Sequence, residues 1–273
     1  MISFLTDYGL YDGFVAACHG VIARIAPDQR ITDITHLVPA RDIRRGAAVL
    51  AETVPYLPDG SVHVAVVDPG VGTGRRAVVL VSARGDLLVG PDNGLLPEAA
   101  GALGGLVAGY EIKSPAVLAA RVSHTFHGRD VFCPAAARLA AGTPVAEVGP
   151  ELDPASLVRL HAPVCRRDPA TGEVVGEVRT VDHFGNVQTA IGAGPLAESG
   201  LVPGAGAAVL LRLTGRAQPL RVPFGRTLGD VPPGELVAFL DSAGLFTVAV
   251  NCGDGASRLG VRPGSTVVVS PAR

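Results

Sequence analysis

The chain of 273 residues is 48% hydrophobic, enough to fill one large core or two smaller ones, because a domain usually holds about 100–150 residues. Basic and acidic residues are interspersed and sum to a formal net charge of -2, which argues against nucleic acid and anionic membranes as partners. No apolar run approaches the roughly 20 residues that cross a bilayer, and the first residues do not form a signal-peptide pattern. We therefore expect a cytoplasmic protein of two domains that acts on a small molecule.

The first half of the chain alternates short apolar runs with stretches whose apolar residues recur at helical spacing. This pattern predicts an α/β domain with a mainly parallel sheet. The expected strands are Ile2–Thr6, Ile31–Ile34, Val62–Val67, Ala77–Ser82 and Leu87–Val89. The expected helices are Gly13–Ile25, Asp42–Val54 and Asp130–Ala141. Asp42 and Asp130 come near the starts of their helices, where a carboxylate complements the helix dipole.

The second half consists of short β-rich runs separated by glycine and proline, which predicts a small all-β domain. Its clearest runs are Val174–Val181, Ala207–Leu213, Leu236–Leu240 and Phe246–Val250. We expect the boundary near Leu157 to His161, with an α/β domain over residues 1–157 and a β domain over residues 158–273.

The glycine-rich segment Asp68–Arg76 lies between two apolar runs and reads as a loop between buried strands. It is not a dinucleotide-binding loop, because that fingerprint needs its own glycine spacing and a helix directly after it. It is not a phosphate-binding P-loop either, since the chain's only lysine is Lys113. The segment therefore predicts a tight loop that holds Asp68 and Arg75 near each other.

Metal binding is the weaker hypothesis for the histidines. His124, His127 and Asp130 have a spacing that one helix face could use for a metal, but Gly128 within the set weakens that geometry. The other histidines, among them His19, His36 and His183, are expected to be surface or hydrogen-bonded structural residues. The four cysteines form no Cys-x-x-Cys pair, which argues against structural zinc and a redox dithiol. They are Cys18, Cys133, Cys165 and Cys252.

Polar clusters follow several expected strands, where ligands bind in open α/β sheets. They are Thr6-Asp7-Tyr8-Gly9, Asp68 with Arg75, Gly90-Pro91-Asp92-Asn93-Gly94, and His124-Thr125-Phe126-His127-Gly128-Arg129-Asp130. In the β-rich half, the segment Asp182–Asn186 is either a strand interrupted by a bulge at Gly185 or a binding loop. In the second interpretation the Asn186 amide suits a purine edge and Asp182 could hold an ammonium group.

Taken together and in this order, these motifs resemble the S-adenosylmethionine hydroxide adenosyltransferases, which are relatives of the fluorinase and chlorinase enzymes. The matching motifs also include Asp33-Ile34-Thr35-His36, Asp68-Pro69-Gly70-Val71-Gly72, Phe184-Gly185-Asn186 and Asn251-Cys252-Gly253. The resemblance implies a Rossmann-like N-terminal α/β domain and a C-terminal β-barrel. It also implies a homotrimer whose sites lie between one subunit's N-terminal domain and its neighbour's C-terminal domain.

The resemblance further implies hydrolysis of S-adenosyl-L-methionine to adenosine and L-methionine, with no cofactor. The family's Asp, Arg and His triad maps onto Asp68, Arg75 and His127. The halogenating relatives have tyrosines at the positions of Asp68 and His127 and a serine at that of Gly128. This chain therefore favours water over halide.

By the same resemblance, Asp7 binds the ribose hydroxyls, Asp182 and Ser242 the methionine end, and Asn186 the adenine. The full set of expected substrate-binding residues is Asp7, Tyr8, Asp182, Phe184, Asn186, Ser242, Asn251 and Cys252. The chain departs from the fluorinase at two positions, with Ala243 in place of an arginine and Arg41 in place of an aromatic residue. Phe224 and Leu228 are both near the place of the aromatic residue that stacks on adenine.

The sequence leaves three alternatives to the hydrolase open. A halide-using, chlorinase-like adenosyltransferase would depend on chloride. A non-catalytic S-adenosylmethionine or adenosine-binding protein would bind without turnover, its triad being an ion-pair network. A metal hydrolase would lose its activity to a chelator.

Overall fold

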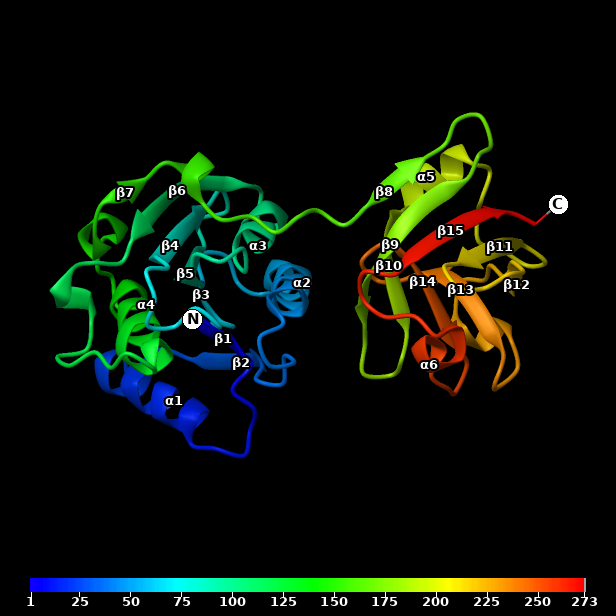
Figure 1. The fold of residues 1–273 in the computed structure, drawn as a ribbon. Coiled ribbons are helices and arrows are strands. Elements are labelled where there is room, and N and C mark those ends of the chain that lie inside the picture. Colours follow the sequence, from blue (N-terminus) through cyan, green and yellow to red (C-terminus); the bar gives the residue numbers. More distant parts are fainter. Residues whose placement is uncertain (273) are drawn as a thin grey trace. The chain divides into compact units, whose positions relative to one another are not determined.

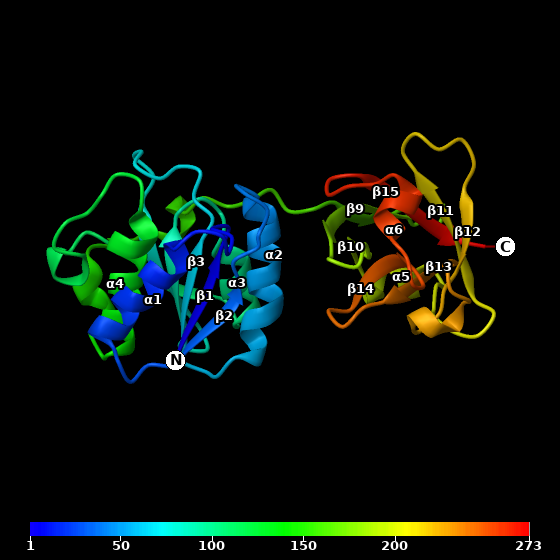
Figure 2. The same ribbon diagram turned by 90° about the horizontal axis from the view of Figure 1, so that it is seen from below.

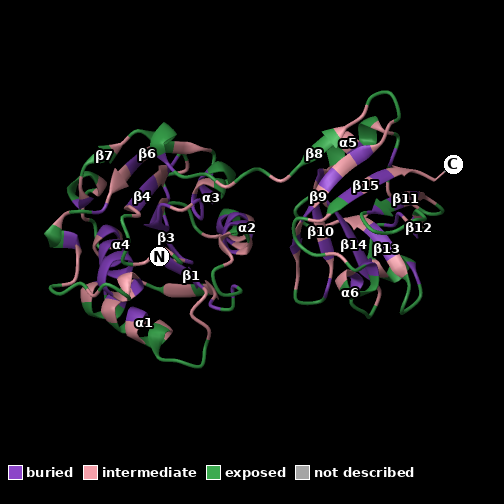
Figure 3. Ribbon diagram, viewed as in Figure 1, coloured by how far each residue is buried: buried purple, intermediate pink, exposed green. Residues whose placement is uncertain are grey.

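The computed structural model describes residues 1–272 and divides into two compact units, Met1–Leu160 and a second unit that begins at His161 (Figure 1). Buried residues concentrate on the strands and inner helix faces of each unit (Figure 3). No helix in this part of the chain is long and apolar enough to cross a membrane. Each unit has its own hydrophobic core.

A seven-stranded sheet with the order β2-β1-β3-β5-β4-β6-β7 forms the centre of residues 1–160. Its strands are β1 (Ile2–Thr6), β2 (Ile31–Thr35), β3 (Val62–Val66), β4 (Ala77–Ser82), β5 (Leu87–Pro91), β6 (Leu106–Glu111) and β7 (Glu151–Leu152). The pairings β1–β2, β1–β3 and β3–β5 are parallel, whereas β4–β5, β4–β6 and β6–β7 are antiparallel. The expectation of a mainly parallel sheet is thus only half right. The turn between β4 and β5 is too short for the crossover that parallel strands need.

Helices cover both faces of this sheet (Figure 2). They are α1 (Phe14–Ile25), α2 (Ile43–Thr53), α3 (Pro97–Ala102) and α4 (Cys133–Ala140). α1 and α4 pack in one core cluster, and α2 and α3 pack in the other. Because β1 and β3 are buried on both faces, most of their residues are apolar.

The two expected helix starts differ in outcome. Asp42 caps α2 as predicted, since its carboxylate accepts a hydrogen bond from the Arg45 backbone N–H at 2.9 Å. The helix expected from Asp130 instead begins with a π-helical turn, Gly128–Phe132, that leads into α4. The Asp130 carboxylate is not a cap: it accepts from the Ser123 backbone N–H at 2.9 Å and pairs with Arg129. Single π-helical turns are frequent at functional sites.

The second unit is an antiparallel sheet that is nearly closed into a barrel. Its strands are β8 (Cys165–Arg167), β9 (Val174–Val181), β10 (Val187–Gly192), β11 (Ala208–Leu213), β12 (Leu220–Pro223), β13 (Leu236–Leu240), β14 (Leu245–Val250) and β15 (Thr266–Pro271). The order is β12-β11-β15-β9-β10-β14-β13, with β8 paired to β9. A bridge between Phe224 and Ala238 joins the two ends of this order.

Every second residue of β9 and β10 is buried, so one face of the hairpin lines the barrel core. Two short helices, α5 (Ala193–Glu198) and α6 (Gly255–Leu259), add their apolar residues Leu196 and Leu259 to the same core. The α/β unit and the barrel-like β unit together confirm the expected fold class.

Candidate active site

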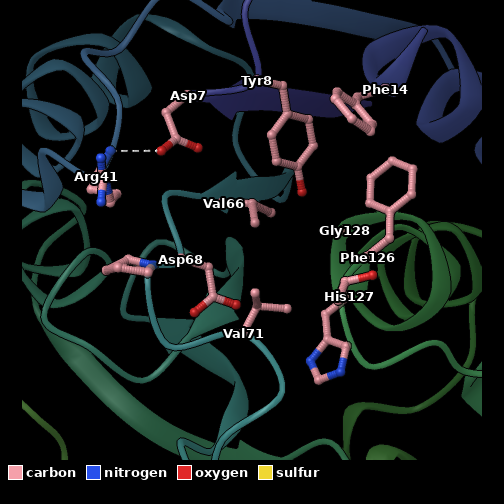
Figure 4. Close-up of a pocket in the computed structure, with 12 residues that line it drawn as sticks. Asp7, Tyr8, Phe14, Arg41, Val66, Asp68, Val71, Phe126, His127 and Gly128 are labelled. Atoms are coloured by element: carbon pink, nitrogen blue, oxygen red, sulfur yellow. Dashed lines mark hydrogen bonds between the residues drawn. The ribbon is translucent and has the colours of Figure 1, made fainter. Parts of the chain in front are cut away.

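The carboxyl ends of β1 and β3 place the first polar groups side by side. The two strands are parallel, with Thr6 in register with Val66, so Asp7 and Asp68 follow neighbouring strand ends. Both carboxylates line a cavity of about 160 Å³, together with side chains of the segment that leads to His127 (Figure 4). This is the edge of the sheet at which an open α/β fold binds its ligands.

Asp68, Arg75 and His127 form one connected chain of hydrogen bonds. The Arg75 Nε donates to Asp68 Oδ1 at 2.9 Å and to Oδ2 at 3.0 Å, and Arg75 Nη2 lies 2.8 Å from His127 Nδ1. The Asp68 and Arg75 side chains are only 5% and 11% exposed. The guanidinium also lies 5.1 Å from the centre of the Phe132 ring. Arg75 therefore fixes the positions of the two pocket-lining groups, Asp68 and His127.

The loop that contains Asp68 and Arg75 is tight. Thr73 bonds back to the Gly70 carbonyl through both its backbone N–H and its hydroxyl. Gly72 has φ +76°, and a Cβ atom there would lie 2.5 Å from the His124 carbonyl oxygen. Only glycine fits this position without displacing the chain, so the loop packs closely against the segment that precedes His127.

The hydrogen bond from Arg75 sets the tautomer of His127. Because a guanidinium has only donors, Nδ1 must accept and the proton of the neutral ring is on Nε2. Burial, and then the charge of Arg75, lower the pKa of His127, while Asp68 acts in the opposite direction. The imidazole is therefore neutral at pH 7, with its Nε2–H available to a ligand.

We expect activity to fall on acidification with an inflection below pH 6.5, the ordinary pKa of histidine. Above that pH the ring is neutral and accepts from Arg75. Below the lowered pKa it becomes a cation that cannot accept and that repels Arg75. The measurement is turnover against pH for the wild type and for His127→Asn. An acid limb of the same shape in the variant would assign it to another group.

Aromatic side chains form one wall of the cavity. The Tyr8 and Phe126 ring centres are 5.8 Å apart, and those of Phe14 and Phe126 are 5.2 Å apart. The Tyr8 hydroxyl points toward Gly128, where a Cβ atom would lie 2.1 Å from it (Figure 4). Burial raises the pKa of Tyr8, so the phenol stays neutral and fills the space beside Gly128.

Asp7 is anchored by the backbone of Arg41, whose N–H donates to Asp7 Oδ2 at 2.8 Å (Figure 4). Arg41 has φ +68°, an uncommon value for a residue other than glycine. Such strained positions concentrate at ligand-binding sites. One Asp7 oxygen is engaged in this way, and the carboxylate still faces the cavity.

The expected binding loop of the second unit is a turn held by hydrogen bonds among its own residues. The Asp182 carboxylate accepts from the backbone N–H groups of Phe184 and Asn186, both at 2.9 Å, and from Asn186 Nδ2 at 2.7 Å. Phe184 is 75% exposed. The Gly185 carbonyl accepts from the Ala256 backbone N–H at 3.0 Å. The turn is therefore fixed beside the start of α6.

Other expected residues of the second unit lie on two further turns. Cys252 is exposed and has φ +57°. Its Sγ lies 3.5 Å from Asn251 Oδ1. Ser242 is exposed in the turn between β13 and β14. Its neighbour Asp241 accepts from Gln188 Nε2 at 2.8 Å, which ties this turn to β10.

A family model described as the SAM hydroxide adenosyltransferase N-terminal domain matches residues 2–149, and the corresponding C-terminal domain model matches residues 176–268. These matches cover most of the chain. The chain belongs to the SAM hydroxide adenosyltransferase family. This membership confirms the resemblance found in the sequence motifs.

Individual relatives of this family agree over the full length. An (R)-S-adenosyl-L-methionine hydrolase of Salinispora arenicola is 57% identical, covering 98% of this chain and 97% of the relative. A fluorinase of Nocardia brasiliensis is 32% identical, covering 98% of this chain and 96% of the relative. The crystal structure of an uncharacterized conserved protein from Thermotoga maritima is similar with a TM-score of 0.90 at 35% identity, covering 99% of this chain and 100% of that one.

In this SAM hydroxide adenosyltransferase, the surroundings of Phe224 and Asp130 argue against two interpretations of the sequence. Phe224 is only 1% exposed and packs against Phe246 with ring centres 5.6 Å apart, so its ring belongs to the barrel core and not to a stacking surface. At His124, His127 and Asp130, the Asp130 carboxylate pairs with the Arg129 cation and accepts from the Ser123 backbone N–H, so the arginine charge opposes a metal there.

Other pocket residues of this family member are not recognisable from the sequence. Phe14, Val71 and Phe126 line the cavity, yet none was singled out as a binding residue. Phe14 and Phe126 are 112 positions apart in the chain, so their ring contact is a product of the fold. The one local signal was that Phe126 and Val71 lie inside two of the family motifs.

Proposed function

We propose that this chain hydrolyses S-adenosyl-L-methionine to adenosine and L-methionine, with Asp68, Arg75 and His127 as the catalytic residues. The observation that supports this most is the hydrogen-bonded chain of these three residues at one cavity. The 57% identical relative, an (R)-S-adenosyl-L-methionine hydrolase, supports the same reaction.

In the proposed reaction a water oxygen attacks C5′ of the substrate in line with the C5′–S bond. The C–O bond forms as the C–S bond breaks, and sulfur takes the electron pair and leaves as the neutral thioether of methionine. No general acid is needed. Catalysis consists of positioning the water and removing its proton.

The three side chains divide this work. The His127 Nε2–H donates to the oxygen of the water and of the hydroxide that develops from it, and the cationic Arg75 favours that negative charge. Neither group can accept the proton, because Arg75 is always protonated and His127 Nε2 already bears hydrogen. Asp68 is therefore the proton acceptor as well as the group that orients Arg75.

We propose a binding role for the remaining residues of the expected set, with Asp7 and Tyr8 toward the ribose. The cavity of residues 1–160 holds about 160 Å³, below the roughly 300–1,000 Å³ of typical ligand pockets. A homotrimer in which a neighbouring subunit completes the pocket with its Asp182–Asn186 turn, Ser242, Asn251 and Cys252 would supply the rest. We also propose a cytoplasmic location, in keeping with four unpaired cysteines.

A halide-using adenosyltransferase is the second candidate, since the 32% identical relative is a fluorinase. The triad argues against it, because a halide has no proton to give to Asp68, whose negative charge therefore continues to offset that of Arg75. A binding protein without turnover is the third candidate, in which the same three residues only form an ion-pair network.

The test is chromatography of the purified protein incubated with S-adenosyl-L-methionine, with and without chloride and with EDTA. We expect adenosine and methionine in equal amounts under all three conditions. A 5′-chloro-5′-deoxyadenosine product would identify the halide enzyme. Binding of the substrate with no product would identify the binding protein, and loss of turnover in EDTA would identify a metal hydrolase.

We expect Asn186→Ala to weaken substrate binding and to leave the maximal rate nearly unchanged, because the proposed role of this amide is to hold adenine. The loss of one good hydrogen bond corresponds to about 0.5–1.5 kcal/mol, or roughly 2- to 10-fold in KM. Steady-state kinetics measure both constants. A fall in kcat with constant KM would contradict a pure binding role.

A further inference from the structure

A second cluster of chemically reactive side chains lies outside the cavity. His19 on α1, Asp33 on β2 and His36 directly after β2 have their ligand atoms within 4.8 Å of one another. The Nε2 atoms of His19 and His36 lie 2.9 Å and 3.0 Å from the same oxygen, Asp33 Oδ1. Within residues 1–272, this is the one group of three or more histidine, cysteine or acidic side chains whose ligand atoms lie this close together.

The imidazole of His36 has an unpartnered nitrogen in a buried position. The residue is 4% exposed, and its Nδ1 lies 2.8 Å from the Thr6 hydroxyl. Its Nε2 has no hydrogen-bond partner, because Asp33 Oδ1 is close but not in the direction that an N–H would need. A buried polar atom left in this way destabilises the fold.

The Thr6 contact is compatible with a tautomer in which His36 Nε2 carries no proton. When Nδ1–H donates to Thr6, His36 Nε2 bears a lone pair beside Asp33 Oδ1 instead of a proton. In that tautomer the lone pair and the carboxylate oxygen are two acceptors 3.0 Å apart, which repel each other unless a cation binds to both.

We propose that His19, Asp33 and His36 form a binding site for one divalent transition-metal ion, with Zn²⁺ as the best fit. Bonds of about 2.0–2.2 Å at angles near 90–110° place neighbouring ligand atoms roughly 2.9–3.5 Å apart, as the contacts at 2.9 Å and 3.0 Å do. Two imidazoles and one carboxylate suit zinc better than Mg²⁺ or Ca²⁺. The Thr6 hydroxyl is the outer partner that orients the ring of a ligating histidine.

Two features of the surroundings support this site. The side chains of His19 and Asp33 are 34% and 39% exposed, so an ion can enter and keep water as its remaining ligands. The ion would also join α1, β2 and the chain after β2. The His36 carbonyl accepts from the Gly9 backbone N–H at 2.8 Å, so the ion would stabilise the segment that presents Asp7 and Tyr8.

None of the three ligands lines the reaction cavity, so the ion takes no part in the chemistry of hydrolysis. The proposal is independent of the proposed function, and its readouts are metal binding and thermal stability. Activity that persists in EDTA is compatible with it.

The experiment is calorimetric titration of the full-length protein with ZnCl₂ after treatment with EDTA and dialysis. We expect one saturable site per chain in the wild type. His19→Ala and Asp33→Asn each remove a partly exposed ligand, and circular dichroism checks that the variants fold. Loss of an outer partner alone weakens a metal site about 10- to 100-fold, so each variant should bind at least tenfold more weakly.

The control is His161→Ala, which removes an exposed histidine of the second unit and should bind zinc like the wild type. Zinc should raise the Tm of the wild type and of this control, but not that of His19→Ala. An absorption spectrum recorded during titration with Co²⁺ identifies the type of ligand. Thiolate ligands produce intense charge-transfer bands, whereas imidazole and carboxylate ligands do not. No saturable binding, equal binding by all variants, or thiolate bands from Cys165 or Cys252 would each overturn the proposal.

Discussion

Asp68→Asn is expected to reduce kcat about 10²- to 10⁴-fold, the range for loss of a general base, with a much smaller change in KM. The amide keeps the size of the side chain but can no longer take the proton of the attacking water. The variant also loses the negative charge that holds Arg75. In the wild type, Arg75 Nε donates to both carboxylate oxygens of Asp68. Kinetics on the folded variant and substrate binding by calorimetry separate the two constants.

Asp92→Asn is the matched control for this prediction. Asp92 is also buried and ion-paired, with Arg76 Nε donating to its Oδ2 at 2.8 Å, but it does not line the cavity. We expect its variant to lose stability and keep its turnover. Equal losses of kcat in the two variants would mean that Asp68 supports the fold and not the reaction.

Gly128→Ala is expected to lower the free energy of unfolding by about 1–3 kcal/mol, as overpacking does, and to reduce turnover about tenfold or more. The new Cβ atom would lie 2.1 Å from the Tyr8 hydroxyl oxygen and 3.0 Å from its Cζ. Tyr8 must move, and its ring forms the cavity wall with Phe126. Thermal unfolding and steady-state kinetics measure the two effects.

A second substitution tests whether the clash with the Tyr8 hydroxyl causes both losses. Tyr8→Phe removes the hydroxyl that the new methyl group meets, so Tyr8→Phe/Gly128→Ala should be more stable and more active than Gly128→Ala alone. Gly101→Ala is the control, because a Cβ atom at Gly101 meets nothing within 4 Å beyond its chain neighbours and the backbone of its own helix. A Gly128→Ala protein as stable and active as the wild type would refute the packing argument.

The parts of the fold that depend on local pattern could be predicted from the sequence. Apolar runs predict β1 and β3 well because both strands are buried on both faces. Asp42 is recognisable as a cap because its hydrogen bond reaches only three residues along the chain. The antiparallel half of the sheet was not predicted, since apolar runs do not encode the direction of their partners. The π-helical turn before α4 has no periodicity of its own.

The residues of the candidate site also differ in how far the sequence predicts them. Asp68 and Arg75 belong to one loop, so their proximity could be inferred from the segment alone. His127 is 52 positions from Arg75, and only the family resemblance connected them. His19, Asp33 and His36 come from a helix, a strand and a loop, and their spacing in the chain matches no metal motif. The burial of Phe224 depends on closure of the barrel, which a single run of residues does not reveal.

Hydrolysis in water enriched in ¹⁸O, followed by mass spectrometry of both products, tests the central claim most directly. Attack of water on C5′ predicts one ¹⁸O atom in the 5′-hydroxyl of adenosine and none in methionine. Adenosine without the label, or no adenosine at all, would contradict in-line attack by a water held at Asp68, Arg75 and His127.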